Sequence, residues 1–101
     1  MNHALYLLTI NAPPTLEDAV VDCLLTVENA HGFSSFPINT HDRLHIGLSL
    51  AEQVSGRQKK ICFQIYVHKA NIAGLLTRLR DEFSGSGIHY WVTRVIEHGQ
   101  T

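Results

Sequence analysis

The stretch Gly32–Tyr66, GFSSFPINTHDRLHIGLSLAEQVSGRQKKICFQIY, sets the architecture that the rest of this chain must satisfy. It contains two segments with strand character, joined by a connector at about residues 39–58 that is neither Gly/Ser-rich nor wholly polar. Hairpin loops usually have about two to five residues, and a connection above roughly a dozen is either functional or disordered. The apolar residues of this connector argue against disorder, so the sequence predicts a functional loop between two strands.

Four segments of the chain have strand patterning. Residues 4–11 are a nearly continuous apolar run, which is typical of a central strand covered on both faces. Residues 33–38 precede the connector, and residues 60–68 follow it with strict alternation of apolar and polar side chains. The fourth segment, residues 88–97, is rich in aromatic and β-branched residues.

Two segments have the apolar spacing of amphipathic helices. The first is predicted over residues 15–28, with Thr15 as its N-cap and acidic residues in its first turn. The second is predicted over residues 70–83 and is followed by Ser84-Gly85-Ser86-Gly87. The apolar positions of the two helices are Leu16, Ala19, Val20, Cys23, Leu24 and Val27, and Ile72, Leu75, Leu76, Leu79 and Phe83.

The resulting order, βαββαβ, predicts an α+β, ferredoxin-like domain with a four-stranded antiparallel sheet. Right-handed connections place both helices on one face of that sheet. The opposite face would carry Cys62, Tyr66 and Trp91, and the first strand is apolar on both sides. An exposed apolar face of this size calls for a partner, so we expect a homo-oligomer joined through its sheets.

Length and composition restrict the classes of function. The chain of 101 residues is one domain, 1–101, with 45% apolar and 17% charged residues. A net charge of −1 gives no basic face for nucleic acid. The two cysteines have no CxxC spacing, and no leader peptide or membrane span is evident, so we expect a cytoplasmic protein without direct membrane insertion.

The centre of the connector has its own local signal. Ser49-Leu50-Ala51-Glu52 fits a capping box, and Gly56 would end the short helical turn that it starts. The connector is either a structural flap that completes an oligomer interface or a flap that binds a ligand or partner. The sequence alone leaves both interpretations open.

His41, Asp42 and His45 are ligand types suited to zinc, copper or nickel. The seven histidines of the chain keep a metal site in consideration. Pro37 and the strand-like FPIN before this pair disfavour a helical His-x3-His arrangement, which favours an ordinary solvated loop. A metal shared between subunits is the alternative.

Two further segments could bind an anion. Arg57, Lys59 and Lys60 lead into the third strand, where a solvated role is the commoner one. The Ser84–Gly87 run has backbone amides suited to phosphate, although such a run more often ends a helix. No spacing joins a nucleophile to a base, so we expect a protein that is not an enzyme.

The string GLSLAEQVSGRQKKICFQI, with GFSSFP before it and FSGSGIHYWV after it, resembles a small bacterial family within the PII-like superfamily of signalling proteins. The resemblance covers nearly the whole chain. It implies a trimer whose subunits bind a small effector at the clefts between them, and a connector that then controls a partner such as a membrane transporter or an enzyme. Relatives associated with heavy-metal efflux add a second implication, a metal-binding accessory protein for cation efflux or tolerance.

The resemblance places the effector near the base of the connector, at Gly56, Arg57 and Gln58, and at the turn that contains Gly85, Gly87 and His89. Residues 84–89 contain no Lys or Arg, unlike the nucleotide-binding members of the superfamily, and the connector has no tyrosine to modify. A nucleotide is therefore disfavoured as the cofactor, and a divalent transition metal remains a candidate. The effector itself is unknown from the sequence.

Overall fold

The computed structural model describes residues 4–28, 32–41 and 57–101. The elements in these ranges follow the predicted βαββαβ order, with one additional short turn of 3-10 helix, η1. Their bounds are β1 Leu5–Ala12, η1 Pro14–Leu16, α1 Glu17–Leu24, β2 Phe33–Thr40, β3 Gln58–His68, α3 Lys69–Glu82 and β4 His89–Arg94.

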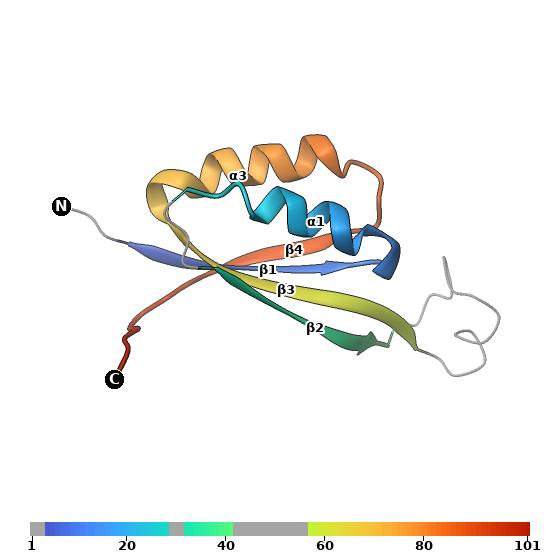
Figure 1. Ribbon diagram of the computed structural model, residues 1–101, viewed down its shortest axis with the longest axis horizontal. Helices are drawn as coiled ribbons and strands as arrows, with labels where there is room; N and C mark the ends of the chain where they lie inside the picture. The colour runs from blue at the N-terminus through green and yellow to red at the C-terminus, as the bar shows by residue number, and fades with distance from the viewer. Residues whose placement is uncertain (1–3, 29–31, 42–56) are drawn as a thin grey trace.

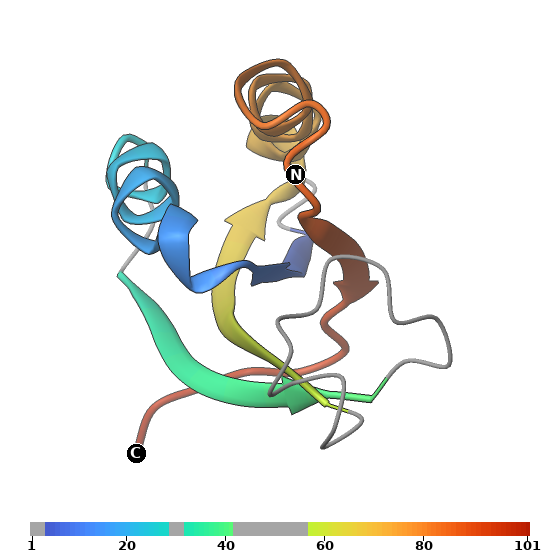
Figure 2. The same cartoon turned by 90° about the vertical axis from the view of Figure 1, so that its right-hand side faces the viewer.

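The strands form one sheet of four, in the order β2-β3-β1-β4, in which every neighbouring pair is antiparallel. Both helices lie on one face of this sheet, as Figures 1 and 2 show from two sides. The predicted α+β, ferredoxin-like architecture is therefore confirmed. β1 is a central strand, as its apolar run predicted, because it pairs with β3 from Leu5↔His68 to Ala12↔Ile61 and with β4 on its other side.

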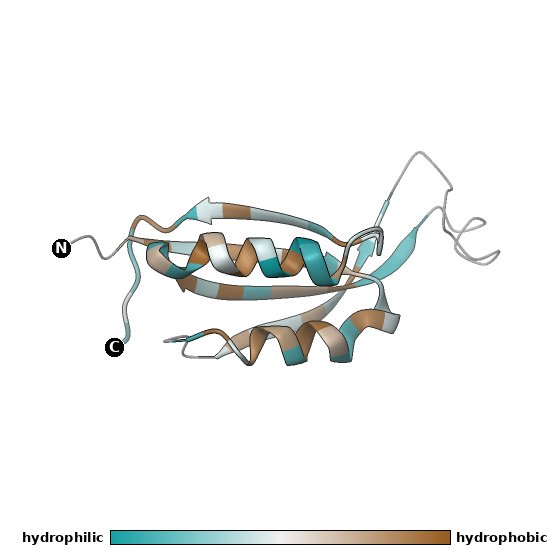
Figure 3. Ribbon diagram, turned by 90° about the horizontal axis from the view of Figure 1, so that it is seen from above, coloured by the Kyte–Doolittle hydropathy of each residue, from teal (hydrophilic) through white to brown (hydrophobic). Residues whose placement is uncertain are grey.

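The hydrophobic core lies between the sheet and the helices. Alternate residues of β1 and β3 point toward the helices, and the helices turn their apolar stripes toward the sheet. Figure 3 shows how apolar and polar residues are interspersed along both helices. The buried residues of the core are Leu8, Ile10, Ala12, Val20, Cys23, Leu24, Phe63, Ile65, Val67, Leu75 and Leu79.

The start of the first helix differs from the prediction. Thr15 does not act as an N-cap: residues Pro14–Leu16 form a 3-10 turn, and α1 begins only at Glu17 without a side-chain cap. The reason is the Pro13-Pro14 pair, because proline at the first position favours a tight turn, closed here by a Leu16 N–H···O=C Pro13 bond of 2.9 Å. Ala19, predicted to face the core, is exposed.

The first helix also ends earlier than residue 28. The Thr26 hydroxyl donates a hydrogen bond of 2.7 Å to the carbonyl oxygen of Cys23. The backbone N–H of Thr26 donates to the same oxygen at 3.3 Å. Hydroxyl side chains compete in this way with the regular helix ladder. The α-helix therefore stops at Leu24 and continues as tighter turns.

Polar side chains connect the two helices. Arg78 on α3 donates to the Glu82 carboxylate at 2.6 Å and also to the hydroxyl of Thr26. The Asn71 amide donates to the carbonyl oxygen of Glu28 at 3.3 Å. These contacts hold the end of α1 beside α3.

The strand ends are shifted by a few residues from the predicted ranges. β2 continues to Thr40 and β3 begins at Gln58, while β4 is shorter than residues 88–97. Beyond Arg94 one more ladder bond remains, from the Val95 N–H to the Leu5 carbonyl at 3.0 Å. Pro37 lies in the edge strand β2, opposite Ile61. The predicted capping box at Ser49–Glu52 lies outside the described residues.

The sheet face opposite the helices is mixed in character. Phe36, Tyr66 and Trp91 are exposed on it, at 41%, 54% and 40%. β1, predicted to be apolar on both faces, contributes Leu5 and Leu7 to this side but also Thr9 and Asn11, because these four residues alternate with core residues along the strand. We refer to this surface as the open face. In the described part of the chain no helix has the length and apolar character needed to cross a membrane.

Candidate functional site at the base of the connector

The two ends of the connector are held together by the β2–β3 ladder. Thr40 and Gln58 are paired across the strands, and the Thr40 hydroxyl donates a hydrogen bond of 3.2 Å to the Gln58 carbonyl oxygen. His41 and Arg57 are the described residues just beyond this pair, and both are exposed. The connector therefore begins and ends at one fixed point of the sheet.

The glycine-containing turn after α3 has the left-handed backbone that favours glycine. Gly85 and Gly87 have φ values of 72° and 86°. The N–H of Ser86 donates to the Phe83 carbonyl at 3.1 Å, and so does the Ser86 hydroxyl. The turn ends the helix, in agreement with the helix-end interpretation of the sequence.

The structure brings this glycine turn to the start of β3. The ammonium group of Lys60 donates a hydrogen bond of 3.5 Å to the carbonyl oxygen of Gly87. A methyl group added to Gly87 would lie 3.9 Å from the ring of Pro13, which places the turn against the end of β1 as well. The glycine turn of the predicted effector site therefore lies beside Lys60, two residues along β3 from Gln58 of the same predicted site.

His89, the last residue of the predicted effector site, lies at the edge of the open face. It is the first residue of β4 and pairs with Asn11, which in turn pairs with Cys62. Its ring lies 5.2 Å from that of Trp91, at an angle of 52°. Three neighbouring strands, β3, β1 and β4, therefore place Cys62, Asn11 and His89 in one row across the sheet.

Asn11 carries the feature of this row that sequence reasoning missed. Its side-chain oxygen Oδ1 is buried and has no hydrogen-bond partner within the described residues. Buried acceptors are normally paired, so an acceptor of this kind marks a place where a donor is expected. The available signal was a polar residue at the end of an otherwise apolar strand.

The row also contains a protected thiol. Cys62 is a free cysteine that is 5% exposed, and burial raises the pKa of its thiol above its ordinary value. A buried, protonated thiol is a poor nucleophile and metal ligand. Cys62 therefore serves in this row as a small apolar side chain.

Of the predicted metal ligands, the structure describes only His41, which is exposed just after β2. Asp42 and His45, and Gly56 of the predicted effector site, lie outside the described residues. Among the residues that are described, no group of three or more His, Cys, Asp or Glu side chains could hold a metal ion.

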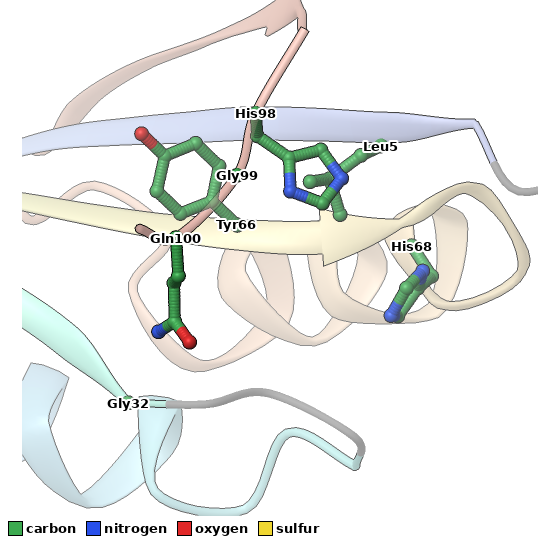
Figure 4. Close-up of a pocket in the computed structure, with 7 residues that line it drawn as sticks. All are labelled: Leu5, Gly32, Tyr66, His68, His98, Gly99 and Gln100. Atoms are coloured by element: carbon green, nitrogen blue, oxygen red, sulfur yellow. The ribbon is translucent and has the colours of Figure 1, made fainter.

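A cavity of about 580 Å³ lies at the other end of the open face. β1, β3 and the segment after β4 line it, and Figure 4 shows its side chains. The lining residues are Leu5, Gly32, Tyr66, His68, His98, Gly99 and Gln100. Sequence reasoning missed this cavity, because the polar C-terminal tail has no periodicity that predicts where it lies.

Solved structures define the class of fold. The chain is similar to a "putative PII-like signaling protein" from Thermus thermophilus, with 22% identity, coverage of 91% of this chain and 87% of that one, and a TM-score of 0.67. It is also similar to the B. subtilis GlnK–ATP complex, with 10% identity, coverage of 94% and 87%, and a TM-score of 0.63. The fold is therefore the PII-like fold that the sequence resemblance implied.

The chain belongs to the DUF3240 family, described as proteins of unknown function, whose family model matches residues 2–101. A DUF3240 family protein from Shewanella baltica shares 26% identity with it over 100% of this chain and 99% of that one, with a TM-score of 0.78. A search of curated proteins finds no match. The predicted membership of a small uncharacterised family with a PII-like fold is thereby confirmed.

Proposed function

We propose that this protein is a non-enzymatic, PII-like regulator that binds a small effector beside the base of the connector and controls a partner protein through the connector. The observation that carries the proposal is the Lys60–Gly87 hydrogen bond, which couples the glycine turn to the first residues of β3. The PII-like fold supports the same class of function.

The coupling follows from the local geometry. An effector that places an acceptor group beside the Gly85–Gly87 turn competes with the carbonyl oxygen of Gly87 for the ammonium group of Lys60. Lys60 lies two residues after Gln58, whose carbonyl accepts the bond from Thr40 that fixes the ends of the connector. A change at the turn therefore reaches the connector over a few residues of one strand.

The proposed working unit is a homotrimer assembled through the half of each open face that lies nearer the connector. Phe36 and Trp91, on the half of the open face nearer the connector, leave large apolar surfaces in contact with water in a single copy. Covering them with neighbouring subunits removes that surface from water and creates seams beside His89 and Asn11. The unpaired Asn11 oxygen would then accept a hydrogen bond from the effector or from a neighbouring subunit.

Thermal unfolding with a panel of compounds tests the proposal. ATP, ADP, AMP and cyclic AMP, and separately the chlorides of zinc, copper, nickel and cobalt, are added to the wild-type protein, to Lys60→Ala and to the control Arg94→Ala. A ligand at about 100 times its Kd stabilises by about 2.7 kcal/mol through linkage. The proposal expects stabilisation of wild type and of Arg94→Ala that is reduced in Lys60→Ala.

Two results would contradict it. A stabilising ligand that acts equally on Lys60→Ala would place its site away from the connector base. A protein that stays monomeric in sedimentation velocity runs at micromolar to millimolar concentration would lack the proposed seams. Metal stabilisation that disappears in the double variant His41→Ala, His45→Ala would instead favour the metal-binding accessory protein.

A further inference from the structure

We propose that the cavity at the Tyr66 end of the open face is a second ligand site, which takes an uncharged, planar heteroaromatic molecule of the nucleobase class. The site lies at the opposite end of the β1–β3 ladder from the connector, since Leu5 pairs with His68 there and Ala12 pairs with Ile61 at the connector end. It does not rest on the proposed function, because residues of a single copy form it.

The cavity is built by two separate parts of the chain. Tyr66 and His68 project from β3 onto the open face, two residues apart on the same side of the strand. After the last ladder bond at Val95, the C-terminal segment passes across the side of the sheet away from the helices (Figure 2). It brings His98, Gly99 and Gln100 over the strands, as Figure 4 shows.

The size of the cavity excludes some occupants. About 580 Å³ lies in the range of about 300–1,000 Å³ that is usual for small-molecule sites. It is far more than one metal ion fills. Gly32 and Gly99 help to leave this room, because neither adds a side chain to the lining.

The chemistry of the lining selects the class of ligand. None of the seven lining residues is an aspartate, glutamate, lysine or arginine, so the site offers no permanent charge to a strongly ionic ligand. Tyr66 is 54% exposed, and its ring presents a surface on which another ring can stack. The Gln100 amide offers a donor and an acceptor together, the pattern that pairs with the edge of adenine.

The imidazoles complete the recognition. Each of His68 and His98 can donate one hydrogen bond and accept another, which suits the ring nitrogens and exocyclic groups of a heterocycle. Because His98 and Gln100 come from the tail, a bound ligand would fix the tail against the sheet. A site made of one aromatic platform and several neutral polar groups is therefore matched to a nucleobase-like molecule.

The test uses the full-length protein labelled with ¹⁵N and ¹³C, titrated with adenine, adenosine and nicotinamide to millimolar concentration. We expect chemical-shift changes at Tyr66, His68 and His98. Tyr66→Ala should weaken binding by about tenfold or more, as loss of a stacking partner does, whereas Tyr66→Phe should stay within about threefold. A chain that ends at Glu97 should lose affinity to a similar degree as Tyr66→Ala.

Phe36→Ala is the matched control, since it removes another exposed aromatic ring of the same face that does not line the cavity. Equal loss in Phe36→Ala and Tyr66→Ala would overturn the assignment, and so would unchanged resonances with all three compounds. Zinc chloride is added alone as a further arm. Zinc-induced changes that need both His68 and His98, without any response to the heterocycles, would replace the proposal with a metal site.

Discussion

Lys60 and Gly87 are joined by a hydrogen bond from the lysine ammonium group to the glycine carbonyl, although 27 residues separate them in the sequence. Replacing Lys60 with alanine should free the glycine turn with little loss of stability, within about 0.5 kcal/mol, because the bond lies at the surface. We expect faster amide hydrogen exchange at Ser86 and Gly87. Arg94→Ala is the control, and equal exchange in both variants would show that Lys60 does not hold the turn.

Gly85 and Gly87 should resist substitution, whereas Gly74 should not. A side chain at φ values of 72° and 86° costs roughly 1–2 kcal/mol per residue, so Gly85→Ala and Gly87→Ala should each destabilise the protein by about that amount. Gly74→Ala, in the middle of α3 with open space around it, should stabilise by about 0.5–1 kcal/mol. Urea unfolding measures all three, and a destabilised Gly74→Ala would contradict the helix geometry.

Phe63 and Phe36 form a matched pair of buried and exposed aromatic residues on adjacent strands. Phe63 is fully buried, so Phe63→Ala should lower the free energy of unfolding by about 3–5 kcal/mol. Phe36 is on the open face, and Phe36→Ala should mainly weaken self-association. Unfolding curves at several protein concentrations separate the two effects, because only association depends on concentration.

Burial raises the pKa of the thiols of Cys23 and Cys62 above the ordinary value of a cysteine. The folded protein therefore holds these protons more tightly than the unfolded chain. Their contribution to stability is fully present below the unfolded-state pKa and is lost as the pH rises through the folded-state pKa values. Urea unfolding at pH 8 and pH 10 should show a fall in stability that is smaller in the Cys23→Ala, Cys62→Ala double variant; an identical fall would assign the effect to other groups.

Replacing Asn11 should not lower the stability of a single copy, but it should weaken the assembly or effector binding. An unpaired buried oxygen costs about 1–3 kcal/mol, so Asn11→Leu should be neutral or stabilising for the dissociated chain. If a neighbouring subunit or the effector supplies the missing donor, the same change should weaken association or effector binding. Dilute-solution unfolding together with sedimentation equilibrium decides this, and Thr9→Val serves as the control on the same strand.

The order of elements and the central place of β1 could be read from the sequence because burial dictates them. The apolar run of residues 4–11 and the alternation of residues 60–68 leave few ways to cover their apolar faces. The ends of the first helix could not be read in the same way. They depend on competition between the prolines, the Thr26 hydroxyl and the helix ladder, which differ by small energies.

The candidate sites could be predicted only in part from the sequence, for a similar reason. Gly85 and Gly87 were recognisable from their type, but the hydrogen bond between Gly87 and Lys60 depends on strand register, which no local pattern specifies. The cavity beside Tyr66 depends on where a tail without periodicity lies. Spacing along the chain predicts faces of helices and strands, and it does not predict which distant segments meet.

Pro37 has a consequence for how copies of this protein can meet. β2 is an outer strand of the sheet, and a proline in an outer strand removes a donor from the row that another strand would need for docking. Growth of the sheet from molecule to molecule through β2, the route that leads to fibres, is thereby discouraged. Contact between copies is directed instead to surfaces whose backbone groups are already satisfied.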